Sequence, residues 1–79
     1  MSQIEKLMRR FNTKPTSIKY HDLEKILLYL EFEKIQAKGS HVKFKHTKLD
    51  ADIVIPVHNN DCKAFYKKQV KKQLQKIIK

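Results

Sequence analysis

Several residue types are scarce in this sequence, and each shortage excludes a class of protein. The 79-residue chain has one glycine and two prolines, which excludes a long flexible linker. Its single cysteine, Cys62, excludes an internal disulfide framework and is typical of a reducing compartment. No apolar run approaches the ~20 residues that a membrane-spanning helix needs, and the first residues lack the apolar segment of a secretory signal. We therefore expect one small cytoplasmic domain.

Acidic residues are scarce as well. Eight aspartates and glutamates stand against 18 lysines and arginines, which gives a net charge of +10. No acidic residue follows Asp61, whereas seven lysines do: Lys63, Lys67, Lys68, Lys71, Lys72, Lys76 and Lys79. A surface built only for solubility would mix the two signs. The imbalance predicts a polyanionic partner, with nucleic acid favoured over an acidic membrane or protein surface.

Two helices are predicted near the N-terminus. Ser2 and Glu5 have the spacing of a capping box. Apolar side chains then recur at helical spacing: Ile4, Leu7, Met8 and Phe11. Residues 12–17 contain Pro15 and show no periodicity, so we expect a loop there. A second helix is predicted from about His21 to Leu30, because its apolar residues form one stripe.

From Phe32 onward the apolar residues recur at every second position, which is typical of strands. Ile35 and Ala37 alternate with polar residues in the first predicted strand. Lys38 and Gly39 then form the predicted hairpin turn, because glycine tolerates the positive φ that such turns require.

Two more strands and a helix complete the chain. We expect the second strand over residues 40–46 and the third over residues 53–57, where Pro56 requires an edge position because it has no N–H. A helix over about residues 66–78 directs four apolar side chains inward: Val70, Leu74, Ile77 and Ile78. The prediction is an α+β fold of order α-α-β-β-β-α, a small three-stranded antiparallel sheet with the helices packed on one face.

The alternation assigns six side chains to the face that the helices leave open: Lys34, Gln36, Lys38, His41, Lys43 and Lys45. His41 is the candidate for chemistry, because histidine is the side chain best suited to proton transfer near neutral pH. On RNA it would remove the proton of a 2′-hydroxyl, whose oxygen then attacks the adjacent phosphate while lysines offset the developing charge. This chemistry needs no metal ion or other cofactor. On the alternation alone, an exposed histidine is more often a surface residue with no catalytic role.

Three motifs resemble the HicA family of toxin ribonucleases. They are GSH at residues 39–41, IVIPVH at residues 53–58, and the basic C-terminal helix. The preceding helix, with DLE at residues 22–24, is similar to the family's first helix, so the resemblance covers roughly residues 18–78. That helix ends in LEF at residues 30–32, where the family often has Leu-Gly-Phe.

The resemblance implies a fold like that of double-stranded-RNA-binding domains, cleavage of messenger RNA, and neutralisation by a HicB-type antitoxin that covers the active site. It places the family's motif histidine at His41 and its motif glycine at Gly39, with Ser40 between them. It also implies that residues 18–79 form the HicA-like domain and that residues 1–17 are an added N-terminal helix and loop.

Other side chains are candidates for supporting roles. By alternation His58 shares the open face, where it would protonate the leaving 5′-oxygen or contact a phosphate, unless it is only solvated at the strand end. Seven lysines are expected to bind RNA: Lys38, Lys43, Lys45, Lys67, Lys68, Lys71 and Lys72. The last four are predicted to point away from the Val70–Leu74 side of the helix and to bind phosphates near its N-terminus. Cys62 is assigned no role, and no residues show the spacing of a metal site.

Two other functions stay open at this point. A non-catalytic RNA-binding module would use the same basic face, but it needs no histidine at a turn-to-strand junction and would favour stacking aromatics. A small structural protein of a ribonucleoprotein is the third possibility. We expect most aromatic side chains to lie at core or helix positions, and the protein alone to be a monomer or weak oligomer.

Overall fold

The secondary-structure elements follow one another in the predicted order. A computed structural model describes residues 2–77, with a three-stranded antiparallel sheet in the order β1-β2-β3. The helices are α1 (Gln3–Thr13), the short 3-10 helix η1 (Pro15–Ser17), α2 (Tyr20–Tyr29) and α3 (Ala64–Ile77). The strands are β1 (Glu33–Gln36), β2 (His41–Lys45) and β3 (Ile53–Pro56). The predicted α+β fold is confirmed.

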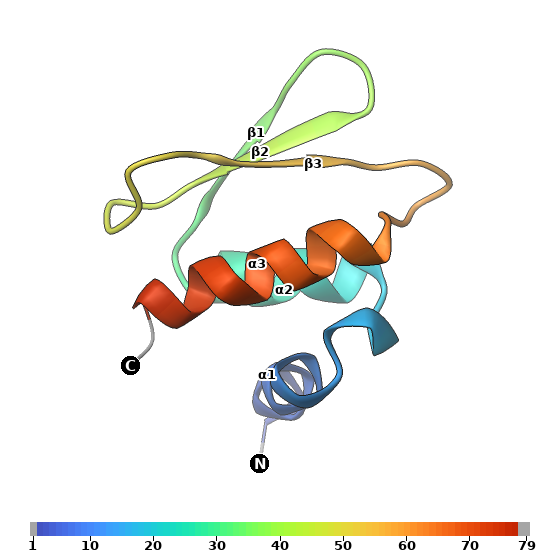
Figure 1. The fold of residues 1–79 in the computed structure, drawn as a ribbon, viewed down its shortest axis with the longest axis vertical. Coiled ribbons are helices and arrows are strands. Elements are labelled where there is room, and N and C mark those ends of the chain that lie inside the picture. The colour runs from blue at the N-terminus through green and yellow to red at the C-terminus, as the bar shows by residue number, and fades with distance from the viewer. Residues whose placement is uncertain (1, 78–79) are drawn as a thin grey trace.

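These elements form three layers (Figure 1). The sheet lies on one side, α2 and α3 lie beneath it, and α1 lies on the side of these two helices that is remote from the sheet. Phe44 of β2, Ile26 of α2 and Val70 of α3 are each exposed by 1% or less, so they form the centre of the core. The helices therefore cover one face of the sheet and leave the other face open, as predicted.

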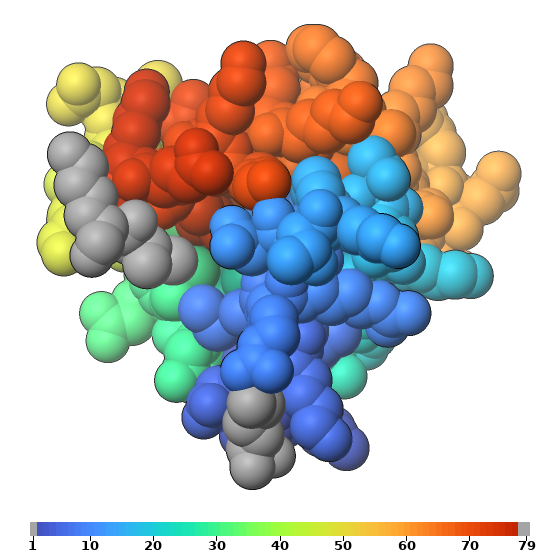
Figure 2. Space-filling model, turned by 60° about the horizontal axis from the view of Figure 1, so that its bottom comes forward, coloured from blue at the N-terminus to red at the C-terminus, as the bar shows by residue number. Residues whose placement is uncertain are grey.

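Helix α1 begins as its sequence predicts, with one difference at the cap. Ser2 Oγ accepts a hydrogen bond from the Glu5 backbone N–H at 3.3 Å, but the Glu5 carboxylate accepts from the Ser2 hydroxyl instead of the Ser2 backbone. The helix lies against α2 and η1 (Figure 2) and buries Phe11 in the core. In the segment predicted to be a loop, η1 begins at Pro15, whose ring fixes a helical φ.

The C-terminal end of α2 shows the structural consequence of having LEF where the family often has Leu-Gly-Phe. Glu31 has a φ of 70°, in the left-handed region. The Phe32 N–H donates to the Leu27 carbonyl at 3.0 Å, and the Glu31 N–H donates to the Leu28 carbonyl at 3.1 Å. These two bonds form a Schellman motif, in which glycine is favoured because it has no Cβ to oppose a positive φ. The helix therefore ends in a motif suited to glycine but carries a strained glutamate there.

We expect Glu31→Gly to raise the free energy of unfolding by about 1 kcal/mol. Glycine removes the roughly 1–2 kcal/mol that a left-handed conformation costs an L-residue. Part of this stabilisation is offset because glycine has more conformational freedom in the unfolded chain. Urea denaturation of both proteins measures the difference. Glu33→Gly is the matched control, and it should lower the stability because Glu33 lies in β1 without a positive φ. Equal or lower stability of the Glu31→Gly variant would contradict the prediction.

The register of β2 and β3 confirms which of their residues face the helices. Val42 pairs with Ile55, and both are buried. His41 pairs with Pro56, and these two lie on the open face because facing residues share a side of the sheet. The strand that contains Pro56 lies at an edge, as its missing N–H predicts.

The predicted orientation of β1 is wrong by one residue. Lys34 pairs with the buried Phe44, so it lies on the helix side of the sheet, and Gln36 lies on that side too. Ile35 and Glu33 lie on the open face instead. A shift of one residue exchanges the two faces of a whole strand. The open face therefore has fewer polar groups from β1 than the alternation predicts.

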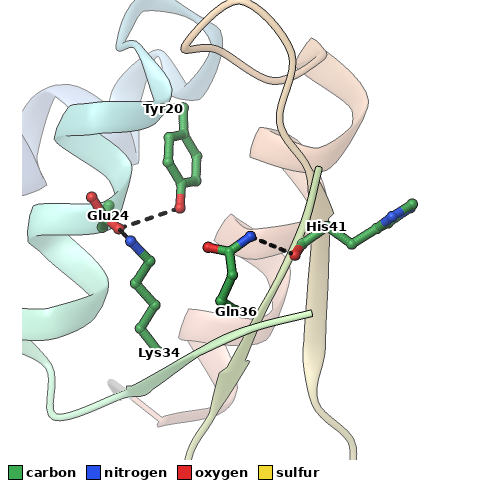
Figure 3. A network of polar contacts seen from close by, with 5 residues as sticks. All are labelled: Tyr20, Glu24, Lys34, Gln36 and His41. Atoms are coloured by element: carbon green, nitrogen blue, oxygen red, sulfur yellow. Dashed lines mark hydrogen bonds and ion pairs between the residues drawn. The ribbon is translucent and has the colours of Figure 1, made fainter. Parts of the chain in front are cut away.

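Polar partners on the helix side account for this orientation (Figure 3). The Lys34 ammonium forms an ion pair with the Glu24 carboxylate, which also accepts a hydrogen bond from the Tyr20 hydroxyl at 3.4 Å. Burial, reinforced by the nearby Glu24 charge, raises the pKa of Tyr20, so the hydroxyl keeps its proton. The Gln36 amide donates to the His41 carbonyl at 3.3 Å. Counting apolar residues along β1 does not reveal these partners, which lie on other elements.

Helix α3 begins at Ala64, slightly before the predicted start. Val70 and Leu74 are buried and Ile77 is half-buried, as expected, whereas Ile78 lies outside the described residues. Within residues 2–77, no helix is both long enough and apolar enough to cross a membrane.

Candidate active site and nucleic-acid interface

His41 is the first residue of β2 and lies on the open face of the sheet. Its side chain is exposed and points away from the polar contacts between α2 and β1 (Figure 3). Its carbonyl accepts hydrogen bonds from the Ala37 N–H at 3.0 Å and from the Gln36 amide at 3.3 Å. The predicted position of His41 is therefore confirmed. Its imidazole is accessible to solvent, and hydrogen bonds hold its backbone in place.

The turn before His41 favours glycine because of its backbone conformation, and not because a side chain would collide with neighbouring atoms. Gly39 has a φ of 66°, and a Cβ at this position would meet no atom within 4 Å. Any other residue would be forced into the left-handed region. The Ser40 carbonyl accepts the Val57 N–H at 2.9 Å, which joins the turn to the end of β3. The motif therefore sets the position of His41 relative to β3.

The open face around His41 is less basic than predicted. Lys43 is half-buried and Lys45 is exposed on the same face, and Lys38 is exposed in the turn. Glu33 is the register partner of Lys45, so an acidic side chain opposes that lysine. The positive charge near His41 therefore comes from fewer lysines than the alternation implied.

His58 begins a two-residue hairpin turn that was not predicted from the sequence. Asn59 and Asn60 have φ values of 52° and 63°. His58 and Asp61 exchange both backbone hydrogen bonds, at 2.8 and 3.0 Å. Two successive positive φ values are typical of a type I′ turn, in which asparagine is a favoured residue. The pair of asparagines was the signal that would have predicted it.

A pocket of about 330 Å³ lies where the end of β3 meets the start of α3. Its walls are formed by Pro56, His58, Asp61, Cys62, Lys63 and Tyr66. Pro56 is also the register partner of His41, so the pocket adjoins His41 on the sheet. Lys63 and Tyr66 were not predicted site residues, because periodicity does not show which residues of a loop and a helix meet a distant strand. The structure thus places His58 in a pocket beside His41 and adds a lysine and a tyrosine to it.

Asp61, which forms one wall of this pocket, connects the start of α2, the loop after β3 and helix α3. Its Oδ1 accepts hydrogen bonds from the Tyr20 N–H at 3.0 Å and the Cys62 N–H at 2.8 Å, and it lies 3.1 Å from the Lys67 ammonium. Tyr20 is the first residue of α2, and the cap residue Lys19 makes no side-chain bond there, so Asp61 caps α2 from a distant part of the sequence. Partial desolvation raises the pKa of Asp61, but these three partners outweigh it and hold the pKa below its ordinary value.

The prediction that Lys67 points away from the core is wrong. Only 5% of Lys67 is exposed, and it lies on the same side of α3 as Val70 and Leu74. Residues three and four positions apart share one face of a helix, so the spacing itself permitted this placement. Lysine is seldom buried unless its charge is paired, and here Asp61 supplies the partner. Lys67 therefore belongs to the support of the site and not to its exposed surface.

The other predicted lysines of α3 divide into two kinds. Lys68 and Lys72 are exposed. Lys71 is half-buried and lines a groove between α1 and α3 with Met8 and Leu74. Two of the four lysines predicted on this helix are thus fully available to a large anionic ligand.

The remaining histidines and the cysteine have simpler surroundings. His46 Nδ1 accepts the Lys48 N–H at 3.0 Å, so Nε2 carries the hydrogen that the Leu30 carbonyl accepts at 3.1 Å. His21 is exposed at the start of α2. Burial raises the pKa of the Cys62 thiol, which lowers the population of its nucleophilic thiolate. Within residues 2–77, no three His, Cys, Asp or Glu side chains gather closely enough to hold a metal ion.

Comparison with known proteins identifies the family. The family model described as "HicA toxin of bacterial toxin-antitoxin" matches residues 20–76, which include α2, the whole sheet and nearly all of α3. Comparisons with curated proteins and with solved structures gave no match. The matched residues contain the GSH motif, the pocket beside it and the lysines of α3. The chain belongs to the HicA family of toxins from bacterial toxin–antitoxin systems.

Proposed function

We propose that this protein is an endoribonuclease that cleaves messenger RNA with His41 as its general base. Toxins of the HicA family are generally ribonucleases. The observation that carries the proposal is the placement of His41, which is exposed at the start of β2, held through its backbone, and adjacent to a pocket that contains His58 and Lys63. A proton acceptor so placed is accessible to an extended polymer.

In the proposed reaction, an imidazole nitrogen of His41 accepts the proton of a ribose 2′-hydroxyl. The 2′-oxygen attacks the adjacent phosphorus, and the bond from phosphorus to the 5′-oxygen of the next nucleotide breaks. The leaving oxygen takes a proton from an acid, for which His58 is the proposed donor because it lies in the adjoining pocket. The products are a 2′,3′-cyclic phosphate and a 5′-hydroxyl. The reaction uses no metal ion or other cofactor.

The proposed phosphate contacts come from lysines on two elements and a turn. They are Lys38, Lys43, Lys45, Lys68, Lys71 and Lys72. Positive charge at these positions draws RNA to the surface and offsets the charge that develops on the phosphoryl oxygens. Lys67 is left out of the set because its ammonium is paired with Asp61 in a buried position.

The proposed partner is a HicB-type antitoxin that covers the open face around His41. Residues 1–17 are proposed to be an extension of the HicA domain that covers its helical layer, because α1 lies on the far side of α2 and α3 and buries Phe11 in the common core. The proposed site of action is the cytoplasm, where messenger RNA is translated.

The test is incubation of the purified protein with end-labelled single-stranded RNA in the presence of EDTA. We expect cleavage that EDTA does not prevent, with cyclic phosphate at the new 3′-ends. Cleavage that EDTA abolishes would overturn the metal-free reaction. Binding without any cleavage would instead favour a non-catalytic RNA-binding module.

A further inference from the structure

Phe65 is an aromatic side chain in an unexpected place. At 61% exposure it is the most exposed of the large apolar residues within positions 2–77, although it lies in the first turn of α3. Its ring meets the ring of Tyr66 edge to face, with centroids 5.2 Å apart and an interplanar angle of 82°. The contact restrains both rings, and most of the Phe65 side chain stays open to solvent. An exposed and oriented aromatic ring of this kind is a surface on which a flat ligand stacks.

The same side of α3 carries positive charge. Lys68, Lys72 and Lys76 follow Phe65 at spacings of three and four residues, and all of them are exposed. Residues with these spacings form one stripe along a helix. A ligand that stacks on Phe65 is therefore next to a row of ammonium groups. This combination matches a nucleobase attached to a phosphate backbone.

Tyr66 connects this stripe to the site of the proposed reaction. It forms a wall of the pocket of about 330 Å³ that also contains Pro56, His58 and Lys63. Pro56 pairs with His41 across the sheet. Tyr66 also contacts Phe65, so Pro56 and Tyr66 of this pocket form a route from His41 to Phe65 across the edge strand β3. Among residues 2–77, no strand lies beyond β3 in the sheet to block that route.

We propose that Phe65 and Tyr66 form a stacking platform for an unpaired base of the RNA that flanks the cleaved bond. Phe65 presents its ring to the base, Tyr66 orients Phe65 and closes the pocket, and Lys63 and Lys68 bind the neighbouring phosphates. The inference rests on the proposed ribonuclease function and adds a substrate class to it, namely RNA that is single-stranded on one side of the cleaved bond. Stacking tolerates every base, so the platform selects unpaired structure and not sequence.

Phe65→Leu is the variant that tests the platform. Leucine keeps helix propensity and apolar character but has no ring face. The probe is a short single-stranded RNA of 2′-O-methyl nucleotides, which has no 2′-hydroxyl proton to lose and therefore stays intact during the measurement. We expect Phe65→Leu to weaken its binding by at least about fivefold, as measured by fluorescence anisotropy. The dependence of log affinity on log salt should keep its slope, because no phosphate contact is removed.

Two matched variants give the comparison. Tyr29→Leu removes an aromatic ring that is 57% exposed at the opposite end of α2 from Asp61, and it should change binding by less than about twofold. Lys72→Gln removes a charge from the same stripe and should reduce the salt slope by about one. The bases of a duplex of the same sequence are already stacked on one another. The parent and Phe65→Leu should therefore bind this duplex with equal affinity.

Equal affinity of the parent and Phe65→Leu for the single strand overturns the platform, as does an equal loss on the duplex. If the parent still cleaves ordinary RNA in that case, the proposed function stands and only the platform fails. If the parent neither binds nor cleaves RNA, both proposals fail. A loss confined to single-stranded RNA, with an unchanged salt slope, supports the platform.

Discussion

Replacing His41 by alanine is expected to lower the rate of RNA cleavage by about 10²- to 10⁴-fold, the usual contribution of a positioned general base. The affinity for RNA should change little, because the lysines supply most of the attraction. The fold should also persist, since the imidazole is exposed and the hydrogen bonds of His41 go through its backbone N–H and carbonyl, which alanine keeps. Single-turnover cleavage and anisotropy with the intact 2′-O-methyl probe measure the two effects separately.

His21→Ala is the matched control, because His21 is also exposed but lies at the start of α2. It should cleave at the rate of the parent. Production of each protein in bacteria provides a second measurement, in which the His41→Ala variant permits growth and the His21→Ala variant inhibits it. Cleavage by His41→Ala within a few-fold of the parent would disprove the general-base role.

Asp61→Ala is expected to lower the free energy of unfolding by about 2 kcal/mol. The variant leaves the buried Lys67 ammonium without its partner and removes the cap of the Tyr20 N–H. Removing one member of a fully buried ion pair costs about 3–5 kcal/mol, and we expect less because the Asp61 side chain is 41% exposed. Urea denaturation measures the loss, which is a large fraction of the roughly 4–12 kcal/mol expected for a chain of this size.

Lys67→Met tests whether the loss of stability in Asp61→Ala comes from leaving the buried Lys67 ammonium unpaired. It keeps the apolar stem and removes the ammonium, and the carboxylate left behind is partly solvated and still accepts two backbone N–H groups. The loss of stability should therefore be smaller than in Asp61→Ala. An equal or greater loss would show that packing of the Lys67 stem, and not the pairing of its charge, sets the cost.

The pH dependence of stability checks the charge of Asp61. Its pKa is lower in the folded than in the unfolded protein, so its stabilisation is present above the unfolded value of about 3.9 and is lost as the pH falls through the lower folded value. The difference in stability between the parent and Asp61→Asn should therefore be constant near neutral pH and shrink below about pH 4. A difference that does not change in acid would contradict an ionised Asp61 in the folded state.

Features that depend on neighbouring residues in the chain were predicted well. The cap at Ser2 and the inward side chains Val42 and Phe44 follow from local spacing. The positive φ at Gly39 and the edge position of β3 follow from what glycine and proline can adopt. His41 belongs to this group, because its position depends on a short turn and on the alternation of one strand.

Features that depend on contacts between distant elements were not predicted. The inward orientation of Lys34 depends on Glu24 of α2, and the burial of Lys67 depends on Asp61 in the loop before α3. Periodicity places a lysine by its polarity, whereas its position in the structure depends on whether a carboxylate lies within reach. The exposure of Phe65 is of the same kind, since a helical position alone does not show which side faces the core.

The sequence by itself determined the order of the elements, the faces of β2 and β3, and the position of His41 on the open face, because backbone conformation and hydrophobic periodicity are local properties. Only the tertiary structure decided what surrounds that histidine. The pocket of His58, Lys63 and Tyr66 forms where β3, a type I′ turn and α3 meet, and Asp61 joins that corner to α2. Such contacts link residues far apart in the chain, and they arise from the packing of whole elements around a shared core.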